Sequence, residues 1–183
     1  YSYKLALMVY SKPEDTVELW SNNATISLKS NYLKGYTDGN DSCSANSMAY
    51  SSNTINVGAY ITKKNFYSMI DKSTYSTSNQ SRGDIAYYSS YGIKADGTSI
   101  PDIVAPGAMV ESSFNTYLWA YRRNSDEAPY FSKSATVNGK TYYWGEMEGT
   151  SMATPAVTGI IAQWLQYKPT LTIEEIKDIF RAT

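Results

Sequence analysis

The segment best suited to chemistry is the run Gly149-Thr150-Ser151-Met152-Ala153-Thr154-Pro155-Ala156. It places a serine after a glycine-containing turn and at the start of an apolar segment with helical spacing. A hydroxyl in that position lies among unbonded backbone N–H groups, at the positive end of the helix dipole. The N–H of Ser151 could then stabilise an oxyanion formed when the serine oxygen attacks a carbonyl. Serine is also a preferred helix N-cap, so a purely capping role is the competing interpretation.

Histidine is absent from the 183 residues. A serine is a poor nucleophile without a general base, and that base is usually histidine. The chain therefore cannot hold a complete Ser-His-Asp triad, nor a zinc site built on histidine. No lysine has a spacing that nominates it as an alternative base. We expect this chain by itself to hydrolyse no peptide.

Two short apolar runs, residues 55–60 and 102–105, are predicted to be buried parallel strands that position the serine. Apolar runs of this length, cut by Gly and Pro, are typical of an α/β sheet. Residues 152–166 are predicted to form a helix, with Pro155 in its first turn, where a missing N–H is tolerated. Its residues at helical spacing predict a broad apolar face: Ala153, Ala156, Val157, Ile160, Ile161, Trp164 and Leu165.

Local signals predict three further features. Asn138-Gly139 predicts a hairpin between residues 135–137 and 140–143. Thr172-x-x-Glu175 is a capping box that predicts a second helix, with a buried stripe made of Ile173, Ile176, Ile179 and Phe180. Residues 1–35 alternate as short strands do, which predicts a β-rich N-terminal segment.

Five ordered blocks resemble the subtilisin-like (subtilase, peptidase family S8) serine proteases. Residues 149–155 are similar to the family's nucleophile signature, Gly-Thr-Ser-Met-Ala-x-Pro, and residues 102–107 to its Asp-Ile/Val-x-Ala-Pro-Gly strand and turn. The other three blocks, residues 55–59, 85–92 and 96–101, resemble Val-Ile-x-Val-Gly-Ala, Ala-x-Phe-Ser-Ser-x-Gly and Asp-Gly-x-x-x-Pro. The resemblance implies a partial subtilisin-like α/β fold with parallel strands and a nucleophile helix.

The resemblance also assigns roles to individual residues. Ser151 matches the nucleophile, and the hydroxyl of Thr150 matches a secondary support for the oxyanion. Gly149 and the backbone around Ser89 and Ser90 correspond to walls near the substrate cleft. The family orders its triad Asp, His, Ser along the chain, so the other two members are expected before residue 1. The oxyanion Asn is expected there too, although these residues are available by order: Asn22, Asn23, Asn31, Asn40 and Asn46.

We therefore expect the C-terminal part of a serine endopeptidase that acts through an acyl-enzyme on Ser151. Residues 43–183 would be the C-terminal portion of its catalytic domain, and residues 1–42 the β-rich end of an insertion. A separate N-terminal domain, linked near residues 35–42, is the competing interpretation. A pseudoprotease that keeps the fold as a binding or scaffold module is the alternative function.

The composition of the chain indicates which classes of binding partner to expect. The net charge of −1 gives no sign of a nucleic-acid partner, and no apolar run is long enough to span a membrane. The expected partners are a protein or peptide substrate and the missing N-terminal part of the same protein. The single cysteine, Cys43, cannot form an intrachain disulfide. The family and the polar, tyrosine-rich composition favour an extracellular or cell-envelope location.

Other candidate sites are weaker. Asp38, Asn40 and Asp41 have a calcium-like spacing, but the other ligands of such a loop are missing, so a polar turn is favoured and no metal site is assigned. No cofactor is identified, and calcium binding by the whole protein stays open. Residues 122–127 are expected to be a solvated loop. A group of aromatic residues before the serine would either line a substrate groove or pack internally: Trp119, Tyr142, Tyr143 and Trp144.

Overall fold

The structure is a computed structural model that describes residues 43–76, 79–94, 96–124 and 128–182, with the single positions 10, 12, 14 and 38. Contacts divide the chain into two compact units, Tyr1–Asp41 and Ser42–Thr183, and the second unit is described below. The strands expected within residues 1–35 lie outside the described residues, except for those single positions. So do Asn40 and Asp41 of the expected polar turn, and residues 125–127 of the expected loop.

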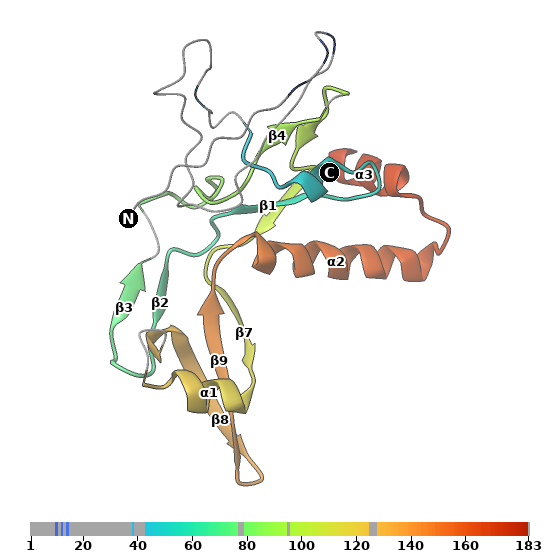
Figure 1. Cartoon of the computed structure of the whole chain (residues 1–183). Helices are drawn as coiled ribbons and strands as arrows, with labels where there is room; N and C mark the ends of the chain where they lie inside the picture. Colours follow the sequence, from blue (N-terminus) through green and yellow to red (C-terminus); the bar gives the residue numbers. More distant parts are fainter. Residues whose placement is uncertain are drawn as a thin grey trace. The chain divides into compact units, whose positions relative to one another are not determined.

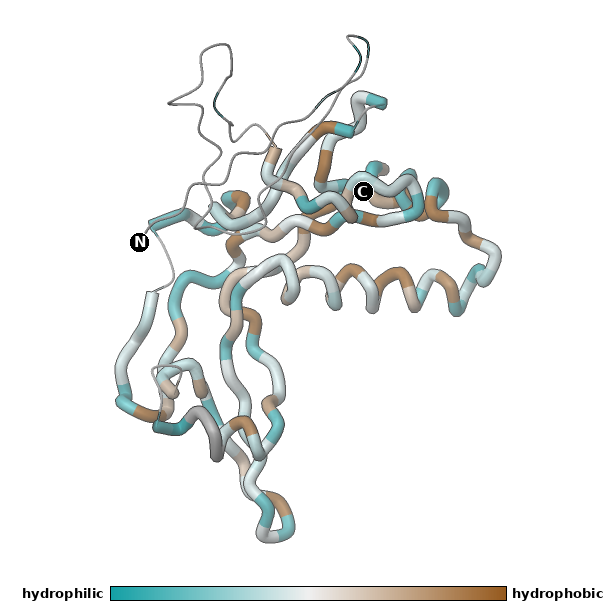
Figure 2. Tube along the Cα trace, in the orientation of Figure 1, coloured by the Kyte–Doolittle hydropathy of each residue, from teal (hydrophilic) through white to brown (hydrophobic). Residues whose placement is uncertain are grey.

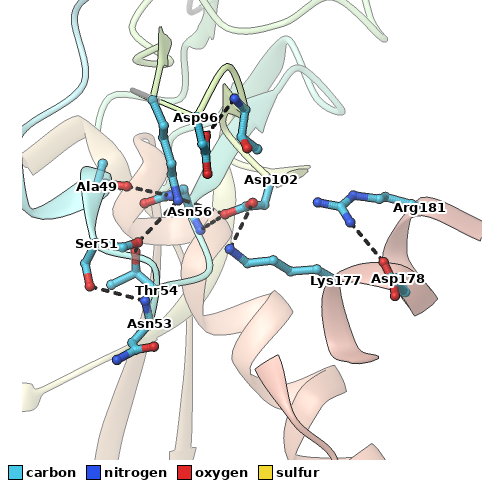
Figure 3. Close-up of polar contacts among 12 residues, drawn as sticks. Ala49, Ser51, Asn53, Thr54, Asn56, Asp96, Asp102, Lys177, Asp178 and Arg181 are labelled. Atoms are coloured by element: carbon cyan, nitrogen blue, oxygen red, sulfur yellow. Dashed lines mark hydrogen bonds and ion pairs between the residues drawn. The ribbon is translucent and has the colours of Figure 1, made fainter. Parts of the chain in front are cut away.

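Two parallel strands form the centre of this unit, as the sequence predicts. Strand β1 (Val57–Tyr60) pairs with β6 (Ile103–Pro106), with Val57 opposite Ile103. The side chain of Asp102 fixes where the pair begins, because its Oδ2 accepts hydrogen bonds from the backbone N of Asn56 at 2.8 Å and from its Nδ2 at 3.2 Å. Lys177 reaches the other oxygen of this carboxylate, with Nζ 3.2 Å from Oδ1 (Figure 3).

Helix α2 (Thr150–Tyr167) packs against both parallel strands (Figure 1). The core between them is built mostly from small side chains: Ala59, Ile61, Ala86, Ala105, Ala108, Ala153 and Val157. Small residues let the helix backbone come close to the sheet, because no large side chain separates them. This close approach fixes the height of the helix above the sheet, and with it the position of the helix start.

One prediction about this helix needs correction. Pro155 is the sixth residue of α2, so the prediction that it lies in the first turn is wrong. Since proline has no N–H, the carbonyl of Ser151 receives no backbone hydrogen bond from residue 155. The predicted apolar face is covered only in part by the described residues: Ala153 and Val157 are buried, whereas Ile160 is 43% exposed. Hydrophobic residues nevertheless recur along the whole helix (Figure 2).

A three-stranded antiparallel sheet lies between β6 and α2 in the chain. Its strands are β7 (Val110–Phe114), β8 (Phe131–Val137) and β9 (Lys140–Met147), in the order β7-β9-β8. The predicted hairpin at Asn138-Gly139 is confirmed, with positive φ angles of 51° and 75° at these two residues. Such angles are those of a type I′ turn, which matches the twist of the flanking strands.

Aromatic rings form the core of this antiparallel sheet. Helix α1 (Thr116–Arg122) contacts β9 and places Trp119 on the ring of Tyr143, with centroids 4.6 Å apart. Phe131 is fully buried and meets the Trp119 ring edge-on at 4.9 Å. Of the two interpretations offered for this aromatic group, packing therefore accounts for Trp119 and Tyr143. Trp144 lies under the ammonium of Lys133, 5.7 Å from ring centroid to Nζ.

The second predicted helix is present as α3 (Ile173–Ala182), and its capping box is confirmed. The backbone N of Thr172 donates to Glu175 Oε2 at 2.8 Å, and the N of Glu175 donates back to Thr172 Oγ1 at 3.2 Å. The rings of Trp164 and Phe180 lie 4.8 Å apart and join α3 to α2. The remaining elements are short: η1 (Ser47–Tyr50), η2 (Ala128–Tyr130), β2 (Asn65–Tyr67), β3 (Thr74–Ser76), β4 (Gly92–Ile93) and β5 (Ser99–Ile100).

Candidate active site

Ser151 is the second residue of α2, and its side chain is exposed. The N-cap is Gly149, so the capping interpretation of this serine does not hold. Within the described ranges, neither the hydroxyl nor the backbone N–H of Ser151 forms a hydrogen bond. A free hydroxyl and a free amide thus sit side by side at the positive end of the helix. That pairing suits a nucleophile and an oxyanion donor.

The turn that presents Ser151 depends on Gly149. Its φ of +136° with ψ of 162° is a backbone conformation that favours glycine, because other residues place a Cβ against the backbone there. Its N–H donates to the carbonyl of Gly107 at 2.8 Å, and its own carbonyl accepts from Met152 N at 3.0 Å. The helix start is thereby tied to the end of β6.

Gly107 completes this junction. A Cβ on Gly107 would lie 2.4 Å from the Cβ of Ala59 and 3.0 Å from the carbonyl oxygen of Gly149, so no side chain fits. The Gly107 carbonyl also accepts a hydrogen bond from the hydroxyl of Tyr88 at 2.8 Å. One carbonyl therefore holds both Gly149 and Tyr88. We call this arrangement of Tyr88, Gly107 and Gly149 the turn brace.

The role of Tyr88 escaped sequence reasoning, although a signal was present. The family block that residues 85–92 resemble has Phe where this chain has Tyr88. The extra hydroxyl is the group that binds Gly107. Burial raises the pKa of Tyr88, and the nearby charge of Glu148 raises it further.

Glu148 also escaped sequence reasoning. It is the residue before Gly149, it is exposed, and partial burial of its carboxyl raises the pKa. No lysine or arginine of the described chain forms an ion pair with it. Other carboxylates do have such partners, among them Asp102, Glu111, Glu146, Glu175 and Asp178.

The other predicted site residues are placed as follows. Thr150 is the first residue of α2 and half-buried, and its carbonyl accepts from Thr154 Oγ1 at 2.8 Å. Ser89 is buried, and its hydroxyl accepts from the N of Ala59 at 3.0 Å, which holds β1 in place. Ser90 is exposed. The cleft and oxyanion roles of these residues stay predictions.

A buried ion pair supports the strand that leads to the site. Glu146 on β9 is 1% exposed, and its Oε1 lies 2.5 Å from Lys63 Nζ. Its second oxygen, Oε2, has no hydrogen-bond partner among the described residues. Because Lys63 comes shortly after β1, the pair joins β9 to the parallel strands. Removing Lys63 would leave a buried charge without compensation.

Two searches confined to the described residues were negative. They contain no group of three or more His, Cys, Asp or Glu side chains that could hold a metal ion. None of their helices has the length and hydrophobicity needed to cross a bilayer.

Comparison with known proteins gives a consistent result. A family model described as the Subtilase family matches residues 20–183. The chain is similar to serine protease AprX of Bacillus subtilis (strain 168), with 37% identity over 107 residues that cover 57% of this chain and 21% of AprX. It is also similar to the uncharacterized protein aq_aa18 of Aquifex aeolicus (strain VF5), with 34% identity over 98 residues that cover 54% of this chain and 39% of that protein. The chain thus spans less than half the length of either relative. No solved structure matches.

Proposed function

Because the chain belongs to the subtilase family, we propose that it supplies the nucleophile of a serine endopeptidase, Ser151. One observation carries the proposal: an unengaged, exposed serine hydroxyl beside an unbonded amide at the start of a helix packed on parallel strands. The similarity to serine protease AprX agrees with it. The whole protein would hydrolyse peptide bonds of protein or peptide substrates.

The proposed reaction is acyl transfer in two stages. Ser151 Oγ attacks the carbonyl carbon of the scissile peptide, while a base accepts its proton and later protonates the leaving amine. The oxyanion that forms accepts a hydrogen bond from the Ser151 N–H, with secondary support from the Thr150 hydroxyl. Water then attacks the acyl carbon while the base accepts a proton from it. The base passes that proton to Ser151 Oγ as the bond between Oγ and the acyl carbon breaks, which releases the carboxylic acid product. Gly149 and the backbone around Ser89 and Ser90 would border the bound substrate.

The base, its Asp partner and the oxyanion Asn are proposed to come from upstream sequence of the same protein. The absence of histidine from the 183 residues supports this, since no folding of the chain can produce the usual base. The chain alone would therefore be inactive. Residues 43–183 would be the C-terminal portion of the catalytic domain, and residues 1–42 the end of an insertion within it. We place the whole protein outside the cytoplasm, in the envelope or medium.

The parallel strands and α2 support the idea of an upstream partner segment. In the described chain β1 pairs with β6 alone, whereas parallel sheets are normally larger and covered on both faces. Ile160 on α2 is 43% exposed, and a Cβ on the neighbouring Gly159 would meet no atom within 4 Å. We propose that the N-terminal part of the same protein covers this face.

A serine-directed fluorophosphonate probe tests the nucleophile. The probe should label the natural-length protein at Ser151, and Ser151→Ala should abolish both labelling and peptide hydrolysis, by about 10⁴-fold or more. Ser112→Ala, an exposed serine on β7, is the matched control and should change neither. Labelling that survives in Ser151→Ala would refute the assignment.

Ile160→Asp tests the proposed cover. If upstream sequence buries this face, the variant should destabilise the natural-length protein by about 3 kcal/mol, because a charge would be buried without a partner. Gln166→Asp, on another side of α2, should change stability by less than about 0.5 kcal/mol. Equal and small effects of the two variants would contradict the cover.

The competing function is a pseudoprotease that keeps the fold for binding. The observation that favours this alternative is the lack of histidine in this chain, since the usual base for Ser151 is missing from it. The sequence upstream decides between the two, since a protein without Asp-x-Gly and His-Gly-Thr-His segments would have no means to activate Ser151.

A further inference from the structure

Tyr88 lies in a segment that is hydrogen-bonded to strand β1 on both sides of it. The backbone N of Ala86 donates to the Ala59 carbonyl at 2.9 Å, and the N of Ala59 donates to the hydroxyl of Ser89 at 3.0 Å. The N of Ser89 also donates to the Ala86 carbonyl at 2.8 Å, which closes a turn around Tyr88. The backbone that carries the Tyr88 ring is therefore held by the same strand that pairs with β6.

The Tyr88 ring packs against the core of small residues between α2 and the parallel strands. The ring of Tyr87 meets it edge-on, with centroids 5.1 Å apart. From this position the Tyr88 hydroxyl donates to the Gly107 carbonyl at 2.8 Å. Burial raises the pKa of Tyr88 above its usual 10.0, so the hydroxyl stays protonated and remains a donor at neutral pH. The side chain thus links the segment beside β1 to the end of β6.

The Gly107 carbonyl receives hydrogen bonds from two separate segments. Gly149 N, at the start of α2, donates to it at 2.8 Å, and the Tyr88 hydroxyl donates at the same distance. A carbonyl oxygen has two lone pairs, so these two donors use both of them. The N of Gly107 donates in turn to the Tyr60 carbonyl at 3.2 Å. Without the Tyr88 hydroxyl, the Gly107 carbonyl would be free to tilt about its remaining bond to Gly149.

The start of α2 transmits the position of this carbonyl to the reacting atoms. Gly149 N is bonded to Gly107, and the Gly149 carbonyl accepts from Met152 N at 3.0 Å. Ser151 lies between Gly149 and Met152 in the chain, so a tilt of the Gly149 backbone moves both the N–H and the Oγ of Ser151. Small movements matter here, because a displacement of about 1 Å can slow a reaction by about 10²-fold.

We propose that Tyr88 is a positioning residue for the reaction at Ser151: its hydroxyl fixes the Gly107 carbonyl, and with it the turn that directs the Ser151 N–H and Oγ toward the scissile carbonyl. The inference rests on the proposed function, because it takes Ser151 to be the nucleophile. Tyr88 acts in this role through Gly107 and Gly149, without touching the substrate. Loss of the hydroxyl should therefore weaken the oxyanion adduct and leave the binding of an unreacted peptide unchanged.

The test compares the natural-length protein with Tyr88→Phe, which keeps the ring and removes the hydroxyl. The probe is a peptide trifluoromethyl ketone with ¹³C at its carbonyl carbon. Ser151 Oγ adds to that carbon, the base accepts the Oγ proton, and the carbonyl oxygen becomes an oxyanion. The matching peptide alcohol, which cannot form the adduct, measures binding alone.

Tyr88→Phe should bind the ketone about fivefold more weakly, the size expected if one neutral hydrogen bond is lost from the adduct. Its affinity for the alcohol should stay within twofold of the natural-length protein. In a ¹³C NMR titration, the oxyanion of the adduct should take up its proton at a higher pH in the variant, because a less well placed Ser151 N–H stabilises the charge less. In a Gly107→Ala background, where the brace is already displaced, Tyr88→Phe should have little further effect.

Tyr75→Phe is the matched control, because it removes a tyrosine hydroxyl that donates to Asp71 from β3. It should change neither affinity nor the titration of the adduct. Equal affinities for the ketone before and after Tyr88→Phe, or an equal loss for ketone and alcohol, would overturn the positioning role while Ser151 is still labelled by the fluorophosphonate. A natural-length protein that forms no adduct and takes no label would overturn the nucleophile, and the role of Tyr88 with it.

Discussion

The parallel pair β1–β6 with α2, and the antiparallel sheet β7-β9-β8 with α1, build their cores from different materials. Alanines and glycines make most of the first, so that backbone meets backbone at Gly107 and Gly149. Phe114, Trp119, Phe131 and Tyr143 make the second, ring against ring. The first region leaves Ile160 of α2 43% exposed, whereas the second buries Phe131 completely.

The difference shows what each region is suited to. Large rings bury much apolar area per residue, so the antiparallel sheet supplies stability from its own side chains. Small residues bury little area, but they let two backbones pack in direct contact, so that each limits the position of the other. The region that presents Ser151 thus gains precise geometry at the expense of stability. Variants of the two regions should accordingly separate stability from labelling of Ser151.

Phe131→Ala should have the largest effect on stability. Removing a fully buried ring that contacts Phe114, Trp119 and Tyr143 should lower the free energy of unfolding by about 3–5 kcal/mol, measured by denaturant titration. Under conditions where the variant stays folded, the labelling rate of Ser151 should remain within twofold of wild type. A labelling defect as large as the one expected below for Gly107→Ala would show that the regions are not separable.

Lys63→Met should come next, because it leaves the buried carboxylate of Glu146 unpaired at the boundary between the two regions. We expect a loss of about 2–3 kcal/mol, below the range for fully buried pairs because Lys63 itself is 39% exposed. The double variant Lys63→Met/Glu146→Leu should recover most of it, since no buried charge remains. Lys133→Met, which removes an exposed partner of Glu111, is the control and should cost less than about 1 kcal/mol.

Gly107→Ala should have the opposite pattern to Phe131→Ala: a smaller loss of stability and a larger loss of Ser151 labelling. The new Cβ would overlap Ala59 and press on Gly149, so we expect a stability loss of about 1–3 kcal/mol and a labelling rate at least tenfold lower. Gly139→Ala, at the hairpin turn with φ +75° and no atom within 4 Å, adds backbone strain of about 1–2 kcal/mol without a clash. Equal labelling defects in the two variants would contradict a specific role for the turn brace.

Tyr88→Phe should have a smaller effect on the same brace. It removes one hydrogen bond to the Gly107 carbonyl and should cost about 1 kcal/mol of stability. If the hydroxyl positions the turn, kcat should fall several-fold while KM stays near its wild-type value. If the variant lowers the melting temperature but leaves kcat unchanged, the Tyr88 hydroxyl has only a structural role.

The smallest effect concerns the capping box of α3, whose hydrogen bonds are exposed to solvent. Hydrogen bonds from Lys168 and then Thr172 lower the pKa of Glu175 below its usual 4.5. A lowered pKa means that the ionised form stabilises the fold above pH 4.5, and that this stability is lost as the pH falls through the lowered value. Titration of Glu175 by NMR should give a midpoint below 4.5, and Thr172→Ala should move it upward. A midpoint at or above 4.5 would contradict the assignment.

Much of the fold follows from short-range signals in the sequence. Residues 55–60 and 102–105 predict the parallel pair, and the structure places its strands at Val57–Tyr60 and Ile103–Pro106. The Asn138-Gly139 turn and the Thr172–Glu175 capping box depend on backbone groups only a few residues away. Both can therefore be predicted from the sequence. The start of a helix near Ser151 can be predicted for the same reason.

Only the tertiary structure decided what surrounds that serine. The turn brace joins Tyr88, Gly107 and Gly149, and the pair Lys63–Glu146 joins residues 83 positions apart, so no local pattern reveals either. The same holds for the part of the α2 face that the described chain leaves open, and for the carboxylate of Glu148 that it leaves unpaired. The sequence determined which residue stands at the start of the helix. Packing between distant segments decided how it is held, because contact distances and burial are properties of the folded chain as a whole.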